Sequence, residues 1–184
     1  MKKFNYWQGD KVRLRGIELT DAETMFQWRL DSDAFSRVDY LSFPRSYEHF
    51  KKEIEESSMK GPDGDSYWFA IENQEGELVG EVGTFDCNRR MGTFKYGVFI
   101  ARNFWGKGYG KEVVRLLLKF YFKELGYQKV TIHIVSFNER SIKFHEKLGF
   151  VREGQLRRMS FTNGRYYDEI YLGMTKEEFE EKLN

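Results

Sequence analysis

The sequence predicts a mixed α/β fold built around one core. Of its 184 residues, 40% are hydrophobic and 17% are aromatic, a composition that favours a folded chain over a disordered one. Segments with a two-residue apolar period alternate with segments of helical period. A chain of about this length buries roughly 70% of its unfolded surface, so it needs neither a metal ion nor a disulfide to fold. We therefore expect a single domain over residues 1–184.

The first third of the chain predicts one strand and two helices. Apolar residues that begin at Val12 indicate the strand, and Thr20 with Glu23 has the spacing of a capping box at the start of a helix. Residues 46–58 predict a second, very polar helix, and residues 61–64 a loop. The inward face of the first helix is expected to carry Ala22, Met25, Phe26 and Trp28.

Three strands are predicted next, over residues 67–72, 78–86 and 93–100. Gly97 lies inside the third strand, where a glycine indicates a bulge, a close backbone approach or a simple packing position. The residues expected to share one face of that strand are Phe94, Tyr96, Val98 and Ile100.

A strongly apolar helix over residues 111–125 and a strand over residues 130–135 are predicted after a glycine-rich segment. Asn138 is placed to cap the next helix, and Gly149 is placed to end it in the left-handed conformation.

The last part of the chain predicts a β-hairpin followed by a short charged helix. Asn163-Gly164 favours a type I′ turn, because both of its central residues need positive φ. The turn joins strand-like runs at residues 155–161 and 166–174, and the helix is expected over residues 176–184.

Charge and cysteine content argue against several classes of protein. With 30 Lys and Arg against 29 Asp and Glu, the net charge of +1 gives no basic field for nucleic acid. The single cysteine, Cys87, excludes an intramolecular disulfide, and three scattered histidines predict no metal site. We read no signal peptide at the start, and the most apolar stretch, residues 113–122, is too short to span a bilayer. We expect a cytoplasmic protein, and its aromatic content leaves a homodimer open.

The glycine-rich segment is a candidate anion site between a strand and a helix. It consists of Trp105, Gly106, Lys107, Gly108, Tyr109 and Gly110. Glycines let backbone N–H groups approach a ligand, and the start of the helix adds unpaired N–H groups and partial positive charge. The spacing fits neither a P-loop nor the dinucleotide-binding fingerprint, so a pyrophosphate site or a plain glycine-rich turn remains.

Three motifs together resemble the GNAT acetyltransferases. Residues 98–110 resemble motif A, R/Q-x-x-G-x-G/A, with Gly108 and Gly110 at its two small positions and Trp105 in place of Arg or Gln. Residues 138–150 resemble motif B, with His145 in place of a tyrosine. Residues 163–168 are similar to the ending found in ribosomal-protein acetyltransferases and bacterial spermidine N-acetyltransferases. The resemblance implies a mixed, mostly antiparallel sheet flanked by helices, with splayed central strands.

The resemblance also implies acetyl-CoA as co-substrate. Its pantetheine arm would lie along the third strand and its pyrophosphate on the glycine-rich segment. The cofactor residues so implied are Val98, Phe99, Ile100, Trp105, Gly106, Lys107, Gly108, Tyr109, Gly110, Lys111, Asn138, Ser141 and Lys147.

Acetyl transfer to an amine requires removal of a proton from the amine and stabilisation of the departing thiolate. His145 is the candidate acid, or the neutral hydrogen-bond partner of the sulfur, with a histidine of no role as the alternative. The base stays open, because Lys95 stands where spermidine acetyltransferases have a glutamate. Glu81 or Asp86 is an alternative, and the amine could also lose its proton before binding.

The acceptor is not fixed by the sequence. The acidic excess over residues 31–58 is best read as an ordinary solvated helix face, although it could also attract a polyamine. Arginines in the hairpin suit an acidic acceptor or an acidic protein surface. Three functions therefore remain open: a small-amine N-acetyltransferase, an acetyltransferase of protein N-termini or ribosomal proteins, and an acetyl-CoA-binding sensor without catalysis.

Overall fold

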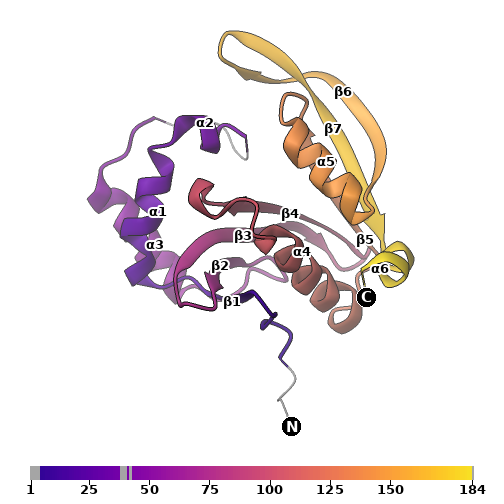
Figure 1. Ribbon diagram of the computed structural model, residues 1–184, viewed down its shortest axis with the longest axis horizontal. Helices are drawn as coiled ribbons and strands as arrows, with labels where there is room; N and C mark the ends of the chain where they lie inside the picture. The colour runs from indigo at the N-terminus through magenta and orange to yellow at the C-terminus, as the bar shows by residue number, and fades with distance from the viewer. Residues whose placement is uncertain (1–4, 38–40, 42, 184) are drawn as a thin grey trace. The chain divides into compact units, whose positions relative to one another are not determined.

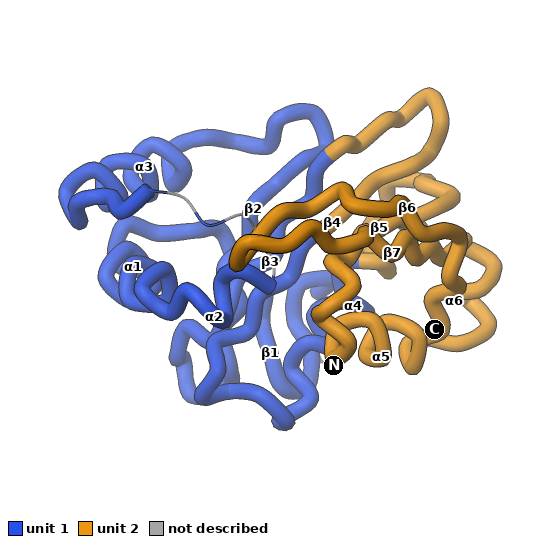
Figure 2. The backbone as a smooth tube through the Cα atoms, turned by 90° about the horizontal axis from the view of Figure 1, so that it is seen from above, with its two compact units in different colours: residues 1–85, 97–117 blue, residues 86–96, 118–184 orange. Residues whose placement is uncertain are grey.

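The computed structural model describes residues 5–37, 41 and 43–183, which form two compact units (Figure 2). Unit 1 contains residues 1–85 and 97–117, and unit 2 contains residues 86–96 and 118–184.

The described strands are hydrogen-bonded in the order β1-β2-β3-β4-β5-β7-β6. The ladders β1–β2, β2–β3, β5–β7 and β6–β7 are antiparallel, and the β4–β5 ladder is parallel. This arrangement confirms the predicted mixed, mostly antiparallel sheet. The strands are β1 (Val12–Gly16), β2 (Trp68–Asn73), β3 (Leu78–Asn88), β4 (Thr93–Ile100), β5 (Lys129–Val135), β6 (Val151–Thr162) and β7 (Arg165–Thr175) (Figure 1).

The β4–β5 ladder is short. The β4–β5 ladder contains two pairs, Thr93 with Lys129 and Phe94 with Val130. On its other side β5 pairs with β7 along its whole length. The β4 edge of β5 therefore has backbone groups beyond Val130 that this ladder leaves unpaired, and such groups need other partners.

The helices of unit 1 cover an apolar core. They are α1 (Ala22–Arg29), α2 (Ser32–Phe35), α3 (Tyr47–Met59) and most of α4 (Tyr109–Lys119), with short 3₁₀ turns at Leu19–Asp21 and Arg102–Phe104. The core cluster contains Ile17, Ala22, Met25, Phe50, Ile54 and Ala70, with Phe26 and Trp28 packed against it. The predicted inward face of the first helix is therefore confirmed.

The start of this helical region differs from the prediction of a Thr20 cap. The carboxylate of Asp21 accepts the backbone N–H of Glu18 at 2.8 Å and two hydrogen bonds from Arg15 at 2.7 and 2.8 Å. Charge-assisted bonds of this kind are stronger than one to a neutral hydroxyl, so Asp21 organises the turn instead of Thr20.

Unit 2 has an aromatic core at the start of β4. Phe94 stacks on Tyr121 at 4.3 Å between ring centroids and meets Tyr127 edge-on at 5.3 Å. Phe94, Tyr121 and Tyr127 are almost fully buried. Tyr121 lies on a π-helical turn, Phe120–Glu124, that continues α4, and this turn completes the helix predicted over residues 111–125. The other helices of unit 2 are α5 (Glu139–Leu148), which lies beside β7, and α6 (Lys176–Lys182) (Figure 1).

Local turn signals in unit 2 are confirmed. The Asn138 side chain accepts the N–H of Ser141 at 3.2 Å, and Gly149 ends α5 with φ of 101°. Asn163 and Gly164 both have positive φ, 48° and 73°, as a type I′ turn requires.

The close backbone approach in this sheet occurs at Gly80, not at Gly97. A Cβ on Gly80 would lie 2.2 Å from the carbonyl oxygen of Phe99, whereas one on Gly97 would meet only the Phe85 ring at 3.9 Å. The predicted common face of β4 also holds only in part. Phe94 and Tyr96 are buried, but beyond Gly97 the buried residue is Phe99, and its neighbours Val98 and Ile100 are half-buried.

Candidate functional site

The glycine-rich segment of unit 1 forms the turn that leads into α4. Gly106 and Gly108 have φ of 80° and 84°, a region that side-chain-bearing residues rarely adopt. Helix α4 begins at Tyr109, directly after this turn. The first N–H groups of a helix have no partner inside it and favour an anion. The local geometry therefore suits a phosphate group.

Lys11 adds a cation to this turn and was missed by the sequence analysis. Its ammonium group donates to the carbonyl of Lys107 at 3.0 Å. It also lies 3.0 Å from the position that a Cβ on Gly108 would take. No local pattern indicates this contact, because 96 residues separate the two lysines.

Glu112, on the first turn of α4, holds the segment that carries Lys11. Its carboxylate accepts the backbone N–H groups of Asp10, Lys11 and Val12 at 2.9, 2.7 and 2.8 Å. A Cβ on Gly9 would collide with the same carboxylate. This contact fixes the chain before β1 against the start of α4.

The last residues of β4, also in unit 1, are the predicted pantetheine strand. Phe99 is buried and packs on Trp28 and Phe35, with ring centroids 5.4 and 6.0 Å apart. The indole N–H of Trp105 donates to the carbonyl of Ile100 at 2.6 Å. That bond ties the glycine-rich segment to the end of the strand and occupies one of its carbonyl groups.

The predicted motif-B residues lie along α5 in unit 2. Asn138 is buried at the cap, Ser141 is half-buried and Lys147 is exposed. The carbonyl oxygen of the Asn138 side chain serves the helix cap, so its capping role is clear without any ligand.

His145 is almost fully buried, with 4% of its surface exposed. Its Nδ1 lies 2.9 Å from the carbonyl oxygen of Ser141, one turn earlier on α5. Because a carbonyl can only accept, we assign the hydrogen to Nδ1, which leaves a lone pair on Nε2. Burial lowers the pKa of His145 to about 4, and the bond to Ser141 opposes this shift. The imidazole is therefore neutral near pH 7.

The candidate bases are held in ion pairs. Lys95 lies 3.0 Å from Asp86, a pair that is confined to unit 2 and partly exposed. In unit 1, Glu81 is buried and accepts from Arg29 at 2.9 Å. The Arg29 guanidinium also lies over the ring of Phe35 at 4.5 Å.

The acidic residues of α2 are neutralised by neighbouring arginines. Arg102 lies 3.0 Å from Asp31 and 2.9 Å from Asp33, and Arg37 also pairs with Asp33. The hydrogen bonds from Arg102 hold the pKa values of both aspartates below their usual range. The acidic excess of the segment is thus partly compensated.

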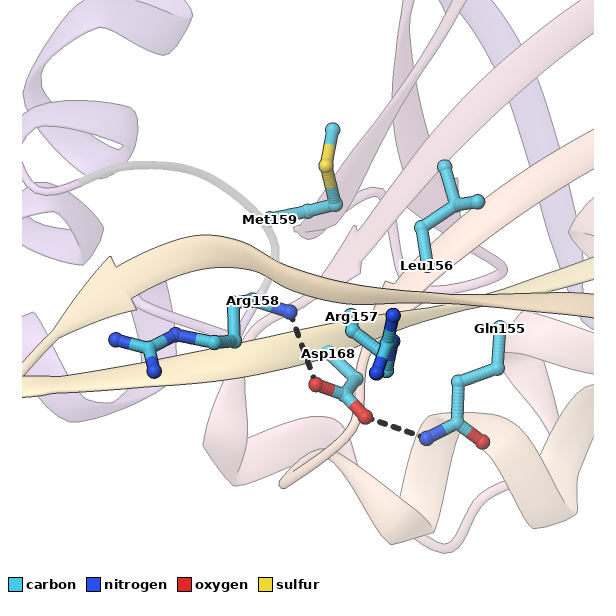
Figure 3. A pocket seen from close by; sticks show the side chains of 6 residues that line it. All are labelled: Gln155, Leu156, Arg157, Arg158, Met159 and Asp168. Atoms are coloured by element: carbon cyan, nitrogen blue, oxygen red, sulfur yellow. Dashed lines mark hydrogen bonds between the residues drawn. The ribbon is translucent and has the colours of Figure 1, made fainter.

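The β6–β7 hairpin carries an open hollow of about 640 Å³. A bulge between Leu156 and Ser160 places Arg158 at φ of 59°. Asp168 accepts the N–H of Arg158 at 2.9 Å and the side-chain amide of Gln155 (Figure 3). These bonds lower the pKa of Asp168 and fix the bulge. The lining residues are Gln155, Leu156, Arg157, Arg158, Met159 and Asp168.

Among the described residues, no group of three or more His, Cys, Asp or Glu side chains is placed to hold a metal ion. None of the described helices combines the length and hydropathy needed to cross a membrane.

Comparisons with known proteins agree with the motifs. Residues 11–151 match the family model of the acetyltransferase (GNAT) domain. The prophage-derived uncharacterized N-acetyltransferase YokL of Bacillus subtilis is 43% identical over 95% of this chain and 96% of its own length. The spermidine N(1)-acetyltransferase of Vibrio cholerae is 28% identical over 86% of this chain and 89% of its own length.

A solved structure shares the fold. It is spermidine N-acetyltransferase from Vibrio cholerae in complex with CoA and spermine, with a TM-score of 0.81 and 22% identity over 93% of this chain and 99% of that one. The family model covers most of the chain and a 43% identical relative covers nearly all of it, so the chain belongs to the GNAT family of N-acetyltransferases.

Proposed function

We propose that this protein transfers the acetyl group of acetyl-CoA to a primary amine. The observation that carries the proposal is the turn from Trp105 to Gly110, which opens α4 with two glycines at positive φ and Lys11 beside them. The relative that was solved with CoA and spermine supports the same cofactor class. Within unit 1, the turn would bind the pyrophosphate and residues 98–100 would bind the pantetheine arm.

The turn fits a pyrophosphate on two grounds. A phosphate oxygen needs close approach to N–H groups, and Gly106 and Gly110 put no side chain in the way. Positive charge from Lys11, Lys107 and Lys111 then adds to the helix terminus without a basic surface over the whole protein. In unit 2, the assigned cofactor residues are Asn138, Ser141 and Lys147.

Acetyl transfer to an amine has two chemical requirements. The amine must arrive without its proton, and the sulfur must be stabilised as the thioester carbon leaves it. Burial lowers the pKa of His145 to about 4, so near pH 7 very little of it is protonated. It therefore cannot serve efficiently as a general acid that protonates the sulfur. We assign it the second role named from the sequence, the neutral hydrogen-bond partner of the sulfur: its Nε2 accepts from the S–H of the product thiol and has no hydrogen to donate to a thiolate.

No free carboxylate is assigned as the base. Glu81 pairs with Arg29, and Asp86 pairs with Lys95. We propose that the amine loses its proton before it binds and that proximity to the thioester supplies most of the rate.

A polyamine is the first candidate acceptor. The Vibrio cholerae relative named for spermidine supports it. A protein N-terminus is the second candidate, because Arg157, Arg158 and Arg165 are exposed on the β6–β7 hairpin and suit an acidic peptide.

The test is thiol release from acetyl-CoA across a panel of spermidine, spermine, small monoamines and acidic N-terminal peptides. Release with the polyamines supports the first acceptor, and release with the peptides alone supports the second. Tight binding of acetyl-CoA without release under any acceptor would show a sensor and would overturn the proposed catalysis.

A further inference from the structure

Two buried polar atoms in unit 2 have no hydrogen-bond partner among the described residues, and they belong to neighbouring rings. They are the hydroxyl of Tyr96 and the Nε2 of His145. The ring centroids lie 5.9 Å apart, with the planes at 50°. Phe150 packs edge-on against both rings, at 6.3 Å from Tyr96 and 5.2 Å from His145. The two polar atoms therefore share one apolar surrounding.

The two atoms are complementary. The phenol can donate a hydrogen bond, and Nε2 can only accept one, because Ser141 fixes the hydrogen on Nδ1. Burial raises the pKa of Tyr96 well above 10, so the phenol keeps its hydrogen. Folded proteins seldom leave such groups unpaired, and a buried pair without partners calls for a ligand or a water molecule.

Tyr96 lies just beyond the short β4–β5 ladder. The β4–β5 ladder ends at Phe94, so Tyr96 stands two residues beyond the last pair. Its ring contacts His145 on α5 and Phe150, which follows the end of that helix. From the sequence, Tyr96 was expected only as a member of an apolar strand face, with no role for its hydroxyl.

We propose that the Tyr96 hydroxyl and the Nε2 of His145 together bind the sulfur of coenzyme A. Tyr96 donates a hydrogen bond to the sulfur, and Nε2 accepts one from the thiol S–H. This inference rests on the proposed function, which is what brings a thiol to the protein. Water is the other small group that both donates and accepts, and the experiment below distinguishes the two.

The two groups act at different stages: Tyr96 donates to the sulfur throughout the reaction, and Nε2 accepts only from the S–H of the product thiol. When the new C–N bond forms, the C–S bond breaks and its electrons remain on sulfur. The hydrogen that the amine nitrogen gives up is the one that the sulfur finally gains, so no residue is consumed. Tyr96 stabilises the thiolate without losing its own proton, because a phenol (pKa about 10) is a weaker acid than a thiol (about 8.5).

Both atoms are sealed from solvent in this structure, so the rings must move apart to admit the sulfur. The thiol is the terminal group of coenzyme A, and only that end has to enter. Tyr96→Phe removes the donor and little else. Tyr67→Phe is the matched control, because Tyr67 packs on Phe69 in unit 1 and is not among the residues assigned to the cofactor.

The experiment compares the Kd of CoA with that of desulfo-CoA, together with kcat and Tm. We expect the wild type and Tyr67→Phe to bind CoA about 3- to 10-fold more tightly than desulfo-CoA. Tyr96→Phe should reduce this ratio, because only the bond to Nε2 remains, and should lower kcat about 10- to 100-fold, as for a lost hydrogen bond to a charged group. Its Tm should stay unchanged or rise, because an unpaired buried hydroxyl has been removed.

Two results would overturn the inference. Tyr96→Phe could keep both the wild-type kcat and the wild-type Kd ratio. It could instead keep the ratio but lose several degrees of Tm, which would show that the pair holds water alone. Failure of the wild type to bind either CoA or desulfo-CoA would overturn the proposed function itself, so the two failures are distinguishable.

Discussion

Burial of His145 as a neutral imidazole makes the stability of the protein depend on pH between about 4 and 6.5. The unfolded chain binds a proton there with the ordinary histidine pKa of 6.5, whereas the folded chain resists it down to about 4. At about 1.4 kcal/mol per pKa unit, the difference corresponds to about 3 kcal/mol. This contribution is fully present above pH 6.5 and is lost progressively as the pH falls toward 4.

The perturbation that isolates this effect is His145→Phe, which keeps an aromatic ring among Tyr96, Phe144 and Phe150 and removes the titrating group. His133→Phe is the matched control. His133 is exposed on β5, where its ring stacks on Tyr171 at 5.7 Å. Urea unfolding of the three proteins at several pH values from 7 to 4 measures the free energy of unfolding of each.

We expect His145→Phe to gain about 3 kcal/mol relative to the wild type between pH 7 and 4, while His133→Phe follows the wild-type slope. Carboxylates whose pKa is lowered in the fold, such as Asp31 and Asp168, lose their contribution at lower pH and do so in all three proteins. Equal slopes for wild type and His145→Phe would refute the neutral, buried imidazole and the mechanism built on it.

Three further predictions concern the turn before α4 in unit 1. Lys11→Met should raise the Kd of acetyl-CoA about 3- to 10-fold by calorimetry, an effect that shrinks with added salt, whereas Lys60→Met, at the C-cap of α3, should leave it unchanged. Glu112→Gln should lower the free energy of unfolding by about 2 kcal/mol and speed hydrogen exchange of the amides at residues 10–12, whereas the exposed Glu181→Gln should do neither. Gly108→Val should weaken acetyl-CoA binding at least about 10-fold, because valine strains a φ of 84° and its Cβ meets Lys11; wild-type affinity would contradict the assignment of the turn.

Local signals predicted the elements that local chemistry decides. Asn138, Gly149 and the Asn163-Gly164 turn each act within a few residues, so their backbone conformations follow from their own side chains. The predicted Thr20 cap was wrong because the start of this helical region depends on a residue outside the local segment. Its rival, Asp21, gains Arg15 from the preceding strand, and a capping pattern read along one segment contains no information about that partner.

Long-range contacts in unit 1 account for most of what the sequence could not show. The carboxylate of Glu112 binds backbone groups about 100 residues away, and Gly80 is required by the carbonyl of Phe99 on the neighbouring strand. Backbone groups look alike in every residue, so no residue type marks where such a contact will fall. Gly97 was a candidate for a close backbone approach because it lies inside a strand, but a Cβ there would contact only the ring of Phe85.

The sequence proposed His145 in unit 2 as a candidate catalytic residue, but it did not predict the protonation state of the imidazole. Motif order pointed to His145, and the residue type alone favoured a group that titrates near neutral pH. Burial among the rings of Tyr96 and Phe150 removes that property and converts the imidazole from a proton donor into an acceptor. Protonation depends on the whole surrounding, which a residue pattern does not contain.

These environments have one joint consequence for the proposed reaction. With His145 neutral and the carboxylates of Glu81 and Asp86 held by cations, no described candidate side chain is both basic and unpaired near pH 7. Acetyl transfer from a neutral amine needs no such base to balance its protons, since the hydrogen that leaves nitrogen ends on sulfur. What the protein then has to supply is the placement of an uncharged amine and a hydrogen bond to the thiolate. Selectivity for the acceptor would follow from the fraction of each amine that is unprotonated, as well as from the surfaces that bind it.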